Sequence, residues 1–200
     1  MRETGPDCKK SAREAFMDAG ERLMGRQGYH ATSVTALCKS SGYPTGSLYH
    51  HFGSKAGLLA AILERGTDRM RQALRDVDVP EGSAAEWLEA HFDTILSLIE
   101  RHPDFTRLTV LVLLEEGFDP EVERSVVSFR EQMIDNMFGV MDKALNEHGA
   151  GVPETVTREL SDMAAALLMG TLALSVADMR RLVTRFLRLL VASTEQLAPR

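Results

Sequence analysis

Apolar residues recur along most of the chain at the three- and four-residue spacing of one helix face. In residues 10–27 the apolar positions are Ala12, Ala15, Phe16, Ala19 and Leu23. This spacing is typical of an amphipathic helix, and further helices are predicted over 33–40, 44–52 and 54–75. No segment sustains the alternation of apolar and polar residues that marks a half-buried strand. The pattern therefore predicts an all-α fold with about nine helices.

Turn-forming residues divide the chain, most clearly at 77–83, where Pro80 and Gly82 stand close together. Beyond this break, a long helix is predicted before the Gly- and Pro-rich stretch at 149–153. Two more helices are predicted after it, over about 153–176 and 177–196. We expect three parts: a small amino-terminal domain over 1–53, a connecting helix over 54–76, and a larger helical domain over 77–200.

The short helices at 33–40 and 44–52, joined by a turn with Gly42, have the dimensions of a helix-turn-helix motif. Such a motif places its second helix in the DNA major groove. In that helix Leu48 and Phe52 point inward and Thr45 and Tyr49 point outward, because residues four apart share a face. Polar side chains on the outer face can contact phosphates and base edges. The motif predicts that double-stranded DNA is a partner.

The distribution of charge agrees with this interpretation. The formal net charge of −6 combines a net of +5 in residues 1–75, with 12 Lys+Arg against 7 Asp+Glu, and a net of −11 in residues 76–200, with 11 against 22. A basic amino-terminal third favours nucleic-acid binding. The acidic remainder is repelled by phosphate and is expected to have another role.

The run 42–52, with Gly28-Tyr29, Thr32-Ser33-Val34 and Ser54-Lys55, resembles the TetR family of bacterial transcriptional regulators over about residues 10–65. The resemblance implies a three-helix DNA-binding domain and a larger all-α domain that dimerises and binds a small molecule. It implies that Lys55 contacts a phosphate. The DNA-contacting positions that it implies are Ser33, Val34, Thr35, Thr45, Gly46, Ser47, Tyr49, His50 and Lys55.

Two positions depart from the family pattern. Many members carry Val where Tyr43 stands and Lys where Thr45 stands. The absence of this lysine is expected to remove one phosphate contact and to flatten the salt dependence of DNA binding by about one charge.

The larger domain offers candidates for an effector site and for a dimer interface. The effector residues that we predict are Trp87, His91, Ile95, Phe105, Leu108, Val112, Phe129, Met133 and Met137, with Glu115 as a further polar position. The alternative is that most of them fill a helical core. Apolar stripes on the last two helices predict a four-helix homodimer interface, formed by Leu160, Met163, Leu167, Thr171, Leu174, Leu182, Phe186, Leu189 and Leu190.

These features predict a ligand-responsive repressor, released from a near-palindromic operator when a small apolar or amphipathic effector binds. An enzyme is the second hypothesis, but no P-loop, nucleophile elbow or zinc-protease motif is present. The third is an interaction module that has lost DNA binding, which only Thr45 favours. With Cys8 and Cys38 as the only cysteines and no apolar segment long enough to cross a bilayer, we expect no metal, no cofactor, no membrane partner and a cytoplasmic location. A redox role for Cys38 stays open.

Overall fold

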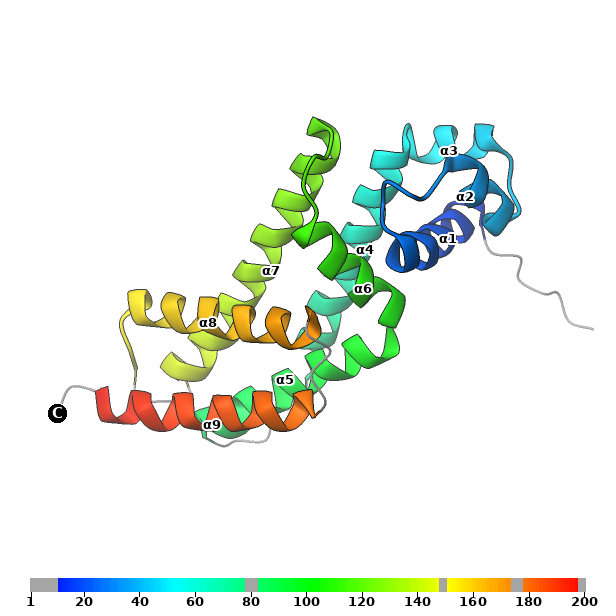
Figure 1. Ribbon diagram of the computed structural model, residues 1–200. Coiled ribbons are helices and arrows are strands. Elements are labelled where there is room, and N and C mark those ends of the chain that lie inside the picture. The colour runs from blue at the N-terminus through cyan, green and yellow to red at the C-terminus, as the bar shows by residue number, and fades with distance from the viewer. Residues whose placement is uncertain (1–10, 78–82, 148–150, 174–177, 198–200) are drawn as a thin grey trace, which may run out of the picture. The chain divides into compact units, whose positions relative to one another are not determined.

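The computed structural model describes residues 11–77, 83–147, 151–173 and 178–197. Within these ranges the secondary structure is helical, with no strand, and the prediction of an all-α fold is confirmed (Figure 1). The described helices are α1 (Ala12–Gln27), α2 (Val34–Ser41), α3 (Thr45–Phe52), α4 (Lys55–Arg75), α5 (Ala84–Arg101), α6 (Pro103–Leu114), α7 (Pro120–Glu147), α8 (Glu154–Ala173) and α9 (Met179–Leu197).

The chain groups into two compact units. Unit 1 comprises residues 1–64 and 104–126, and unit 2 comprises 65–103 and 127–200. This grouping differs from a simple division of the sequence, because most of α6 and the start of α7 join the amino-terminal helices. The expected functional division at residues 53 and 76 stays a prediction.

Local signals fix the ends of the helices in unit 1. Ser11 and Glu14 form a reciprocal capping box at the start of α1, and the Ser33 hydroxyl accepts from the Ala36 backbone N–H at the start of α2. The chain leaves α2 through Gly42, whose φ of 79° lies in the left-handed region that glycine adopts without strain. These helices enclose a small core of fully buried side chains: Phe16, Leu37, Leu48, Leu58, Leu59 and Ile62.

Helix α6 belongs to unit 1 because its start packs closely against α1. A methyl group added to Gly25 would collide with the Asp104 backbone carbonyl, so glycine is needed at this crossing. The Arg26 Nε also lies 3.5 Å from the Asp104 carboxylate. Leu108 and Val112 are buried further along α6.

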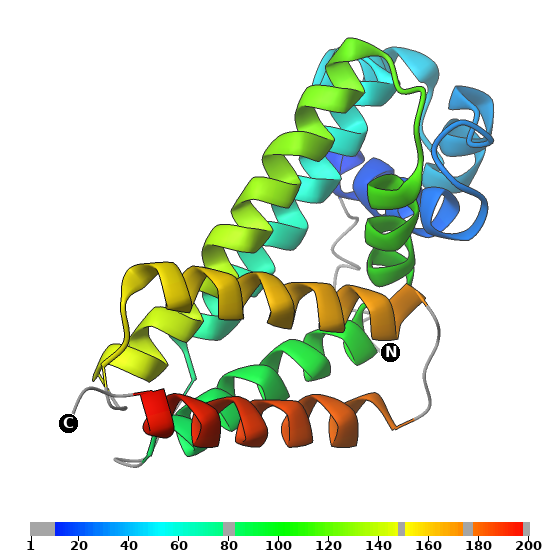
Figure 2. The same ribbon diagram turned by 60° about the vertical axis from the view of Figure 1, so that its left-hand side comes forward.

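Unit 2 is built around one apolar core to which α5, α7, α8 and α9 contribute. Phe92 of α5 and Leu187 of α9 lie in this core, and α9 runs beside α5 (Figures 1 and 2). Charged pairs border the contact between these two helices. Arg180 binds Asp93 and Glu100, and Arg188 Nε lies 2.5 Å from Glu89 Oε1.

Candidate nucleic-acid interface

Helix α3 buries one face and exposes the other. Leu48 is fully buried, and the half-buried Phe52 packs edge-on against Phe16 with ring centroids 6.4 Å apart. On the opposite face Tyr49 is 51% exposed, although large aromatic side chains usually lie inside. Thr45, Gly46 and His50 are exposed beside it, and Ser47 is half-buried. The structure therefore brings the predicted outer face of this helix together at the surface.

The start of α2 adds exposed polar groups. Ser33 and Thr35 are exposed and Val34 is half-buried. Cys38, on the same helix, is half-buried rather than turned fully inward, and its Sγ lies 3.4 Å from Thr45 Oγ1. Helix α2 thus contacts α3 at the residue where α3 begins.

The fold of unit 1 does not require a glycine at position 46. Its φ lies outside the left-handed region, and a methyl group added there would have no heavy atom within 4 Å. Glycine lowers the stability of a helix relative to alanine. Neither packing nor backbone conformation requires glycine here, which is consistent with close approach of an external molecule.

Lys55 has partners in unit 1 that lie far away in the sequence. Its ammonium donates to the backbone carbonyls of Tyr29 and Thr32, each at 3.1 Å, and lies 4.0 Å from the centre of the Tyr29 ring. Burial lowers the pKa of the ammonium, an effect that the nearby carboxylates of Asp119 and Glu115 oppose. The structure thus links Lys55 to the turn between α1 and α2, and the phosphate contact that the family resemblance implies for this residue stays a prediction.

The connection between α6 and α7, residues 115–119, packs against the same turn. The Phe118 ring stacks on His30 at 5.3 Å and meets Tyr29 edge-on at 5.8 Å. His30 Nε2 lies 3.6 Å from Glu115 Oε1. Burial, together with Asp119 and Glu121, raises the pKa of Tyr29 to about 12.

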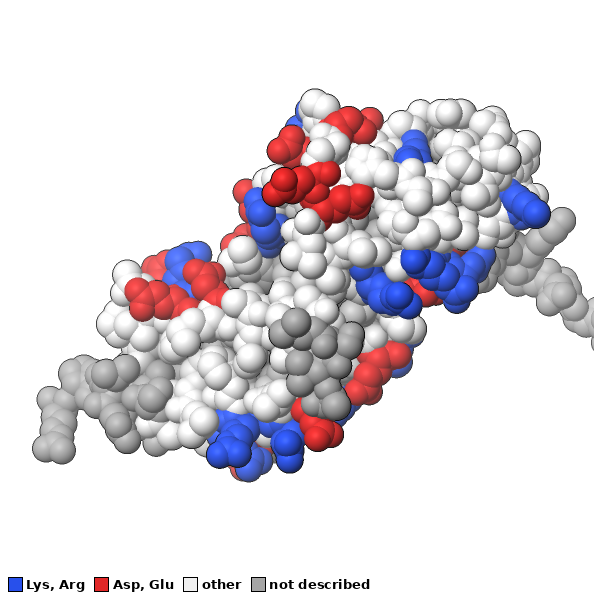
Figure 3. Space-filling view, viewed as in Figure 1, with Lys and Arg blue, Asp and Glu red and all other residues white. Residues whose placement is uncertain are grey.

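Acidic side chains gather around the start of α7 (Figure 3). Glu116, Asp119, Glu121 and Glu123 are exposed there, and the Ser54 hydroxyl donates to Glu121 at 3.0 Å. This acidic group repels phosphate. It lies on the part of unit 1 that includes the connection, whereas α3 carries no Asp or Glu.

The predicted effector residues divide between the two units. Phe105, Leu108 and Val112 belong to unit 1, and the other six belong to unit 2. Within unit 2, Trp87, Ile95 and Met137 lie in the common core, Phe129 is buried, and Met133 is half-buried. The His91 ring stacks on Trp87 at 3.5 Å and its Nδ1 lies 2.8 Å from the Trp87 carbonyl oxygen, which can only accept. Their use in effector binding stays a prediction.

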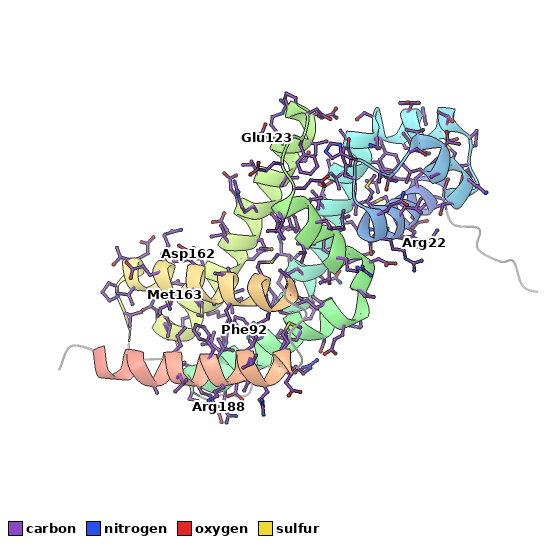
Figure 4. The ribbon with its side chains drawn as sticks, viewed as in Figure 1. Arg22, Phe92, Glu123, Asp162, Met163 and Arg188 are labelled. Carbon is purple, nitrogen blue, oxygen red and sulfur yellow. The ribbon has the colours of Figure 1, made fainter. Side chains whose placement is uncertain are left out.

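The predicted dimer residues do not share one environment. Met163, Leu182 and Leu189 are exposed (55%, 38% and 64%), and Met163 is labelled on α8 in Figure 4. Leu160, Leu167 and Phe186 are half-buried. Leu190 lies in the core of unit 2, and Thr171 is buried, with its hydroxyl donating to the Leu168 carbonyl. The use of the predicted residues in a dimer interface stays a prediction. Leu174 lies outside the described residues.

The described residues offer neither a metal cluster nor a membrane-crossing helix. Among them, no group of three or more His, Cys, Asp or Glu side chains is arranged to hold a metal ion. No helix among them combines the length and apolar character needed to cross a membrane.

Three short helices with a solvent-facing third helix define a helix-turn-helix protein. Residues 16–62 match the model of the bacterial regulatory proteins, tetR family. The chain is 25% identical over 165 residues to the HTH-type transcriptional regulator UidR of Escherichia coli, with 80% of each chain covered. It is 25% identical over 134 residues to the HTH-type transcriptional repressor NemR of Escherichia coli, with 62% of this chain and 67% of NemR covered.

Among solved structures, a TetR transcriptional regulator from Legionella pneumophila superimposes with a TM-score of 0.76 at 22% identity, and the match covers 91% of this chain and 98% of that one. The amino-terminal part of the chain, residues 16–62, is therefore similar in sequence to the bacterial regulatory proteins of the tetR family, and the described fold is similar to that of a TetR transcriptional regulator.

Proposed function

We propose that this protein is a homodimeric repressor that binds a near-palindromic DNA operator through α3 and the start of α2. The observation that carries the proposal is the solvent-exposed face formed by Thr45, Gly46, Tyr49 and His50. Hydroxyl and imidazole groups can donate to phosphates and base edges. The glycine among them leaves room for the DNA backbone.

The start of α2 extends this face. Ser33, Val34 and Thr35 are the residues that we propose as its second DNA-contacting group, and the backbone N–H groups of a helix start favour an anion. Ser47 completes the set on α3.

Dimerisation through α8 and α9 is part of the proposal. The apolar side chains available for it are Met163, Leu182 and Leu189, with Leu160, Leu167 and Phe186 beside them. A two-fold dimer presents two recognition helices to half-sites about one or more DNA turns apart. Repression is favoured as the mode of control by the similarity to a relative named as a repressor.

Release from DNA by a small apolar or amphipathic effector completes the proposal. An effector changes DNA affinity only if it binds one conformation of the dimer more tightly than the other. The aromatic and methionine side chains of unit 2, above all the stacked Trp87 and His91, are chemically suited to such a ligand.

The test is selection of DNA duplexes by the purified protein from a fragmented source genome, at near-physiological salt. Recovery of one near-palindromic sequence would support a dimeric regulator. The selected duplex then serves as a probe for a screen of small molecules that release it. If the protein enriches no sequence, at low salt as well as at physiological salt, specific DNA binding by α3 is wrong.

A further inference from the structure

Thr45, the first residue of α3, contacts α2 through its side chain. Its Oγ1 lies 3.4 Å from the Sγ of Cys38, seven residues earlier in the chain. This contact spans the turn of the helix-turn-helix motif. Pro44 stands at the N-cap of α3 and makes no side-chain hydrogen bond there. The thiol on α2 therefore reaches a hydroxyl at the exposed start of the next helix.

The backbone of Cys38 is fixed at the end of α2. Its carbonyl accepts from the Gly42 backbone N–H at 3.0 Å and from the Ser41 hydroxyl at 3.2 Å. The Ser41 hydroxyl in turn accepts from the Tyr43 backbone N–H at 3.3 Å. On a fixed backbone, a single staggered torsion sets the position of the cysteine sulfur. Cys38 thus holds its sulfur beside Thr45 from a rigid part of the turn.

The chemistry of the pair leaves the Thr45 hydroxyl able to contact DNA. A hydroxyl has one O–H donor and two acceptor lone pairs, and a thiol is a weak donor and a weak acceptor. If the thiol donates, the Thr45 O–H is available to a DNA acceptor. If the hydroxyl donates to sulfur, Thr45 offers DNA an acceptor. In both arrangements the contact favours one staggered rotamer of Thr45 and so one position of its oxygen.

We propose that Cys38 is a positioning residue for Thr45, and that the hydroxyl held in this way determines which base pair is preferred under the start of α3. The inference rests on the proposed function, which supplies the DNA. A hydroxyl that rotates freely among its rotamers meets different base edges in turn. A hydroxyl kept in one orientation favours the base pair whose major-groove edge carries the matching donor or acceptor.

The test compares the discrimination of Cys38→Ala and the wild type under reducing conditions. Duplexes in which each base pair of the selected operator is changed in turn give the discrimination at every position. We expect Cys38→Ala to bind the operator about threefold more weakly per half-site, as for loss of a weak hydrogen bond. The loss of discrimination should be confined to the base pairs under the start of α3. A purely structural role would weaken binding to all duplexes by the same factor.

Further variants show whether the effect passes through Thr45. Thr45→Val removes the hydroxyl and should lose discrimination at the same base pairs. Cys38→Ala should then add nothing, which a double-mutant cycle measures. Cys38→Ser keeps a donor and an acceptor and should recover part of the loss. Ser40→Ala is the matched control, because Ser40 lies on the same helix but accepts from Arg22 of α1, and it should keep the wild-type discrimination.

The orientation of Thr45 can also be measured in the DNA-free proteins. Three-bond couplings to the methyl carbon of Thr45, measured by NMR, report its rotamer populations. The wild type and Ser40→Ala should show one dominant rotamer, and Cys38→Ala should show a mixture. Equal populations in the wild type and Cys38→Ala would overturn the positioning role.

Unchanged discrimination in Cys38→Ala, or additive losses in the double variant, would also overturn the inference. The proposed function stands in either case as long as the wild-type protein selects an operator. Failure of the wild type to select any duplex would instead reject the proposed function, and the role in base preference with it. The couplings in the free protein would then decide whether Cys38 orients Thr45.

Discussion

Tyr49 is the residue whose exposure most directly links structure to function. Half of its surface faces solvent, so its side chain contributes little to the core of unit 1. Tyr49→Ala should weaken binding to the selected operator by about 1–3 kcal/mol and leave the unfolding temperature almost unchanged. Titration of labelled duplex at fixed salt checks the affinity. The control is Tyr49→Phe, which removes only the hydroxyl, and wild-type affinity in Tyr49→Ala would contradict the assignment of α3 as the recognition helix.

A second prediction at the scale of the residue concerns Tyr29: the stability of the protein should depend on pH in the alkaline range. Its pKa in the folded protein is raised to about 12 from the ordinary value of 10.0. As pH rises from 10 towards 12, the unfolded chain ionises first, so the free energy of unfolding falls over this interval. The stabilising effect of the neutral phenol is complete below pH 10.

The measurement is denaturant unfolding at pH 9 and pH 11 for the wild type and Tyr29→Phe. The variant cannot ionise at this position and should lose less stability between the two pH values. Tyr49→Phe is the matched control and should behave like the wild type. Equal losses in Tyr29→Phe and the wild type would show that Tyr29 has an ordinary pKa.

At the scale of the helix, Gly46 and Gly139 are two sites at which the same substitution can be compared. Each lies in a helix, and a methyl group added at either would meet no heavy atom within 4 Å. Alanine should therefore stabilise the protein by up to about 1 kcal/mol at each site. Only Gly46→Ala should weaken DNA binding, because α3 is proposed to approach the DNA and α7 is not.

Thermal unfolding and operator titration of the two variants check this prediction. If Gly46→Ala binds the operator as tightly as Gly139→Ala does, the DNA backbone does not approach Gly46 closely.

A second prediction at the scale of the helix concerns the ion pairs between α5 and α9. Arg180 binds Glu100 through two hydrogen bonds of 3.1 and 3.0 Å, contacts Asp93, and donates to the Ser97 hydroxyl at 3.2 Å. The hydrogen bonds from Arg180 lower the pKa of Glu100. The stabilising effect is therefore present above the ordinary Glu pKa and is lost as pH falls through the lowered value.

Arg180→Ala should lower the unfolding temperature at pH 7 by up to about 3 °C, the scale expected for a network of surface ion pairs. The difference from the wild type should shrink towards pH 3 and in high salt. Arg181→Ala removes a neighbouring arginine that lies 3.8 Å from Asp178, and it should shift the unfolding temperature less. A loss in Arg180→Ala that is the same at pH 7 and pH 3 would show that the effect is not electrostatic.

The whole molecule is proposed to act as a dimer, and Leu189 tests this. With 64% of its surface exposed on α9, Leu189→Glu should leave one chain folded and place a charge in the proposed interface. We expect monomers in sedimentation equilibrium and a large loss of operator affinity. Leu114→Glu is the control, because Leu114 is equally apolar and 70% exposed but lies on α6. A Leu189→Glu protein that remains dimeric would place the interface elsewhere.

Local sequence is enough to specify the helices and the outward face of α3. These features depend on residues three or four apart, on capping serines and on glycines that end helices, all of which act within a few positions. Leu48 inside and Tyr49 outside follow from this local geometry alone. The family resemblance is carried by the same short stretch, so it too can be recognised from the order of the residues.

Which distant segments meet depends on the tertiary fold. Lys55 finds its carbonyl partners 23 and 26 residues away, and residues 104–126 join the amino-terminal helices. Helix periodicity also cannot tell a face that meets the protein's own core from a face left at the surface, because both faces are apolar. For this reason the apolar stripes group Leu190 and Thr171 with Leu189. In the structure Leu190 and Thr171 are buried within unit 2, whereas Leu189 is exposed.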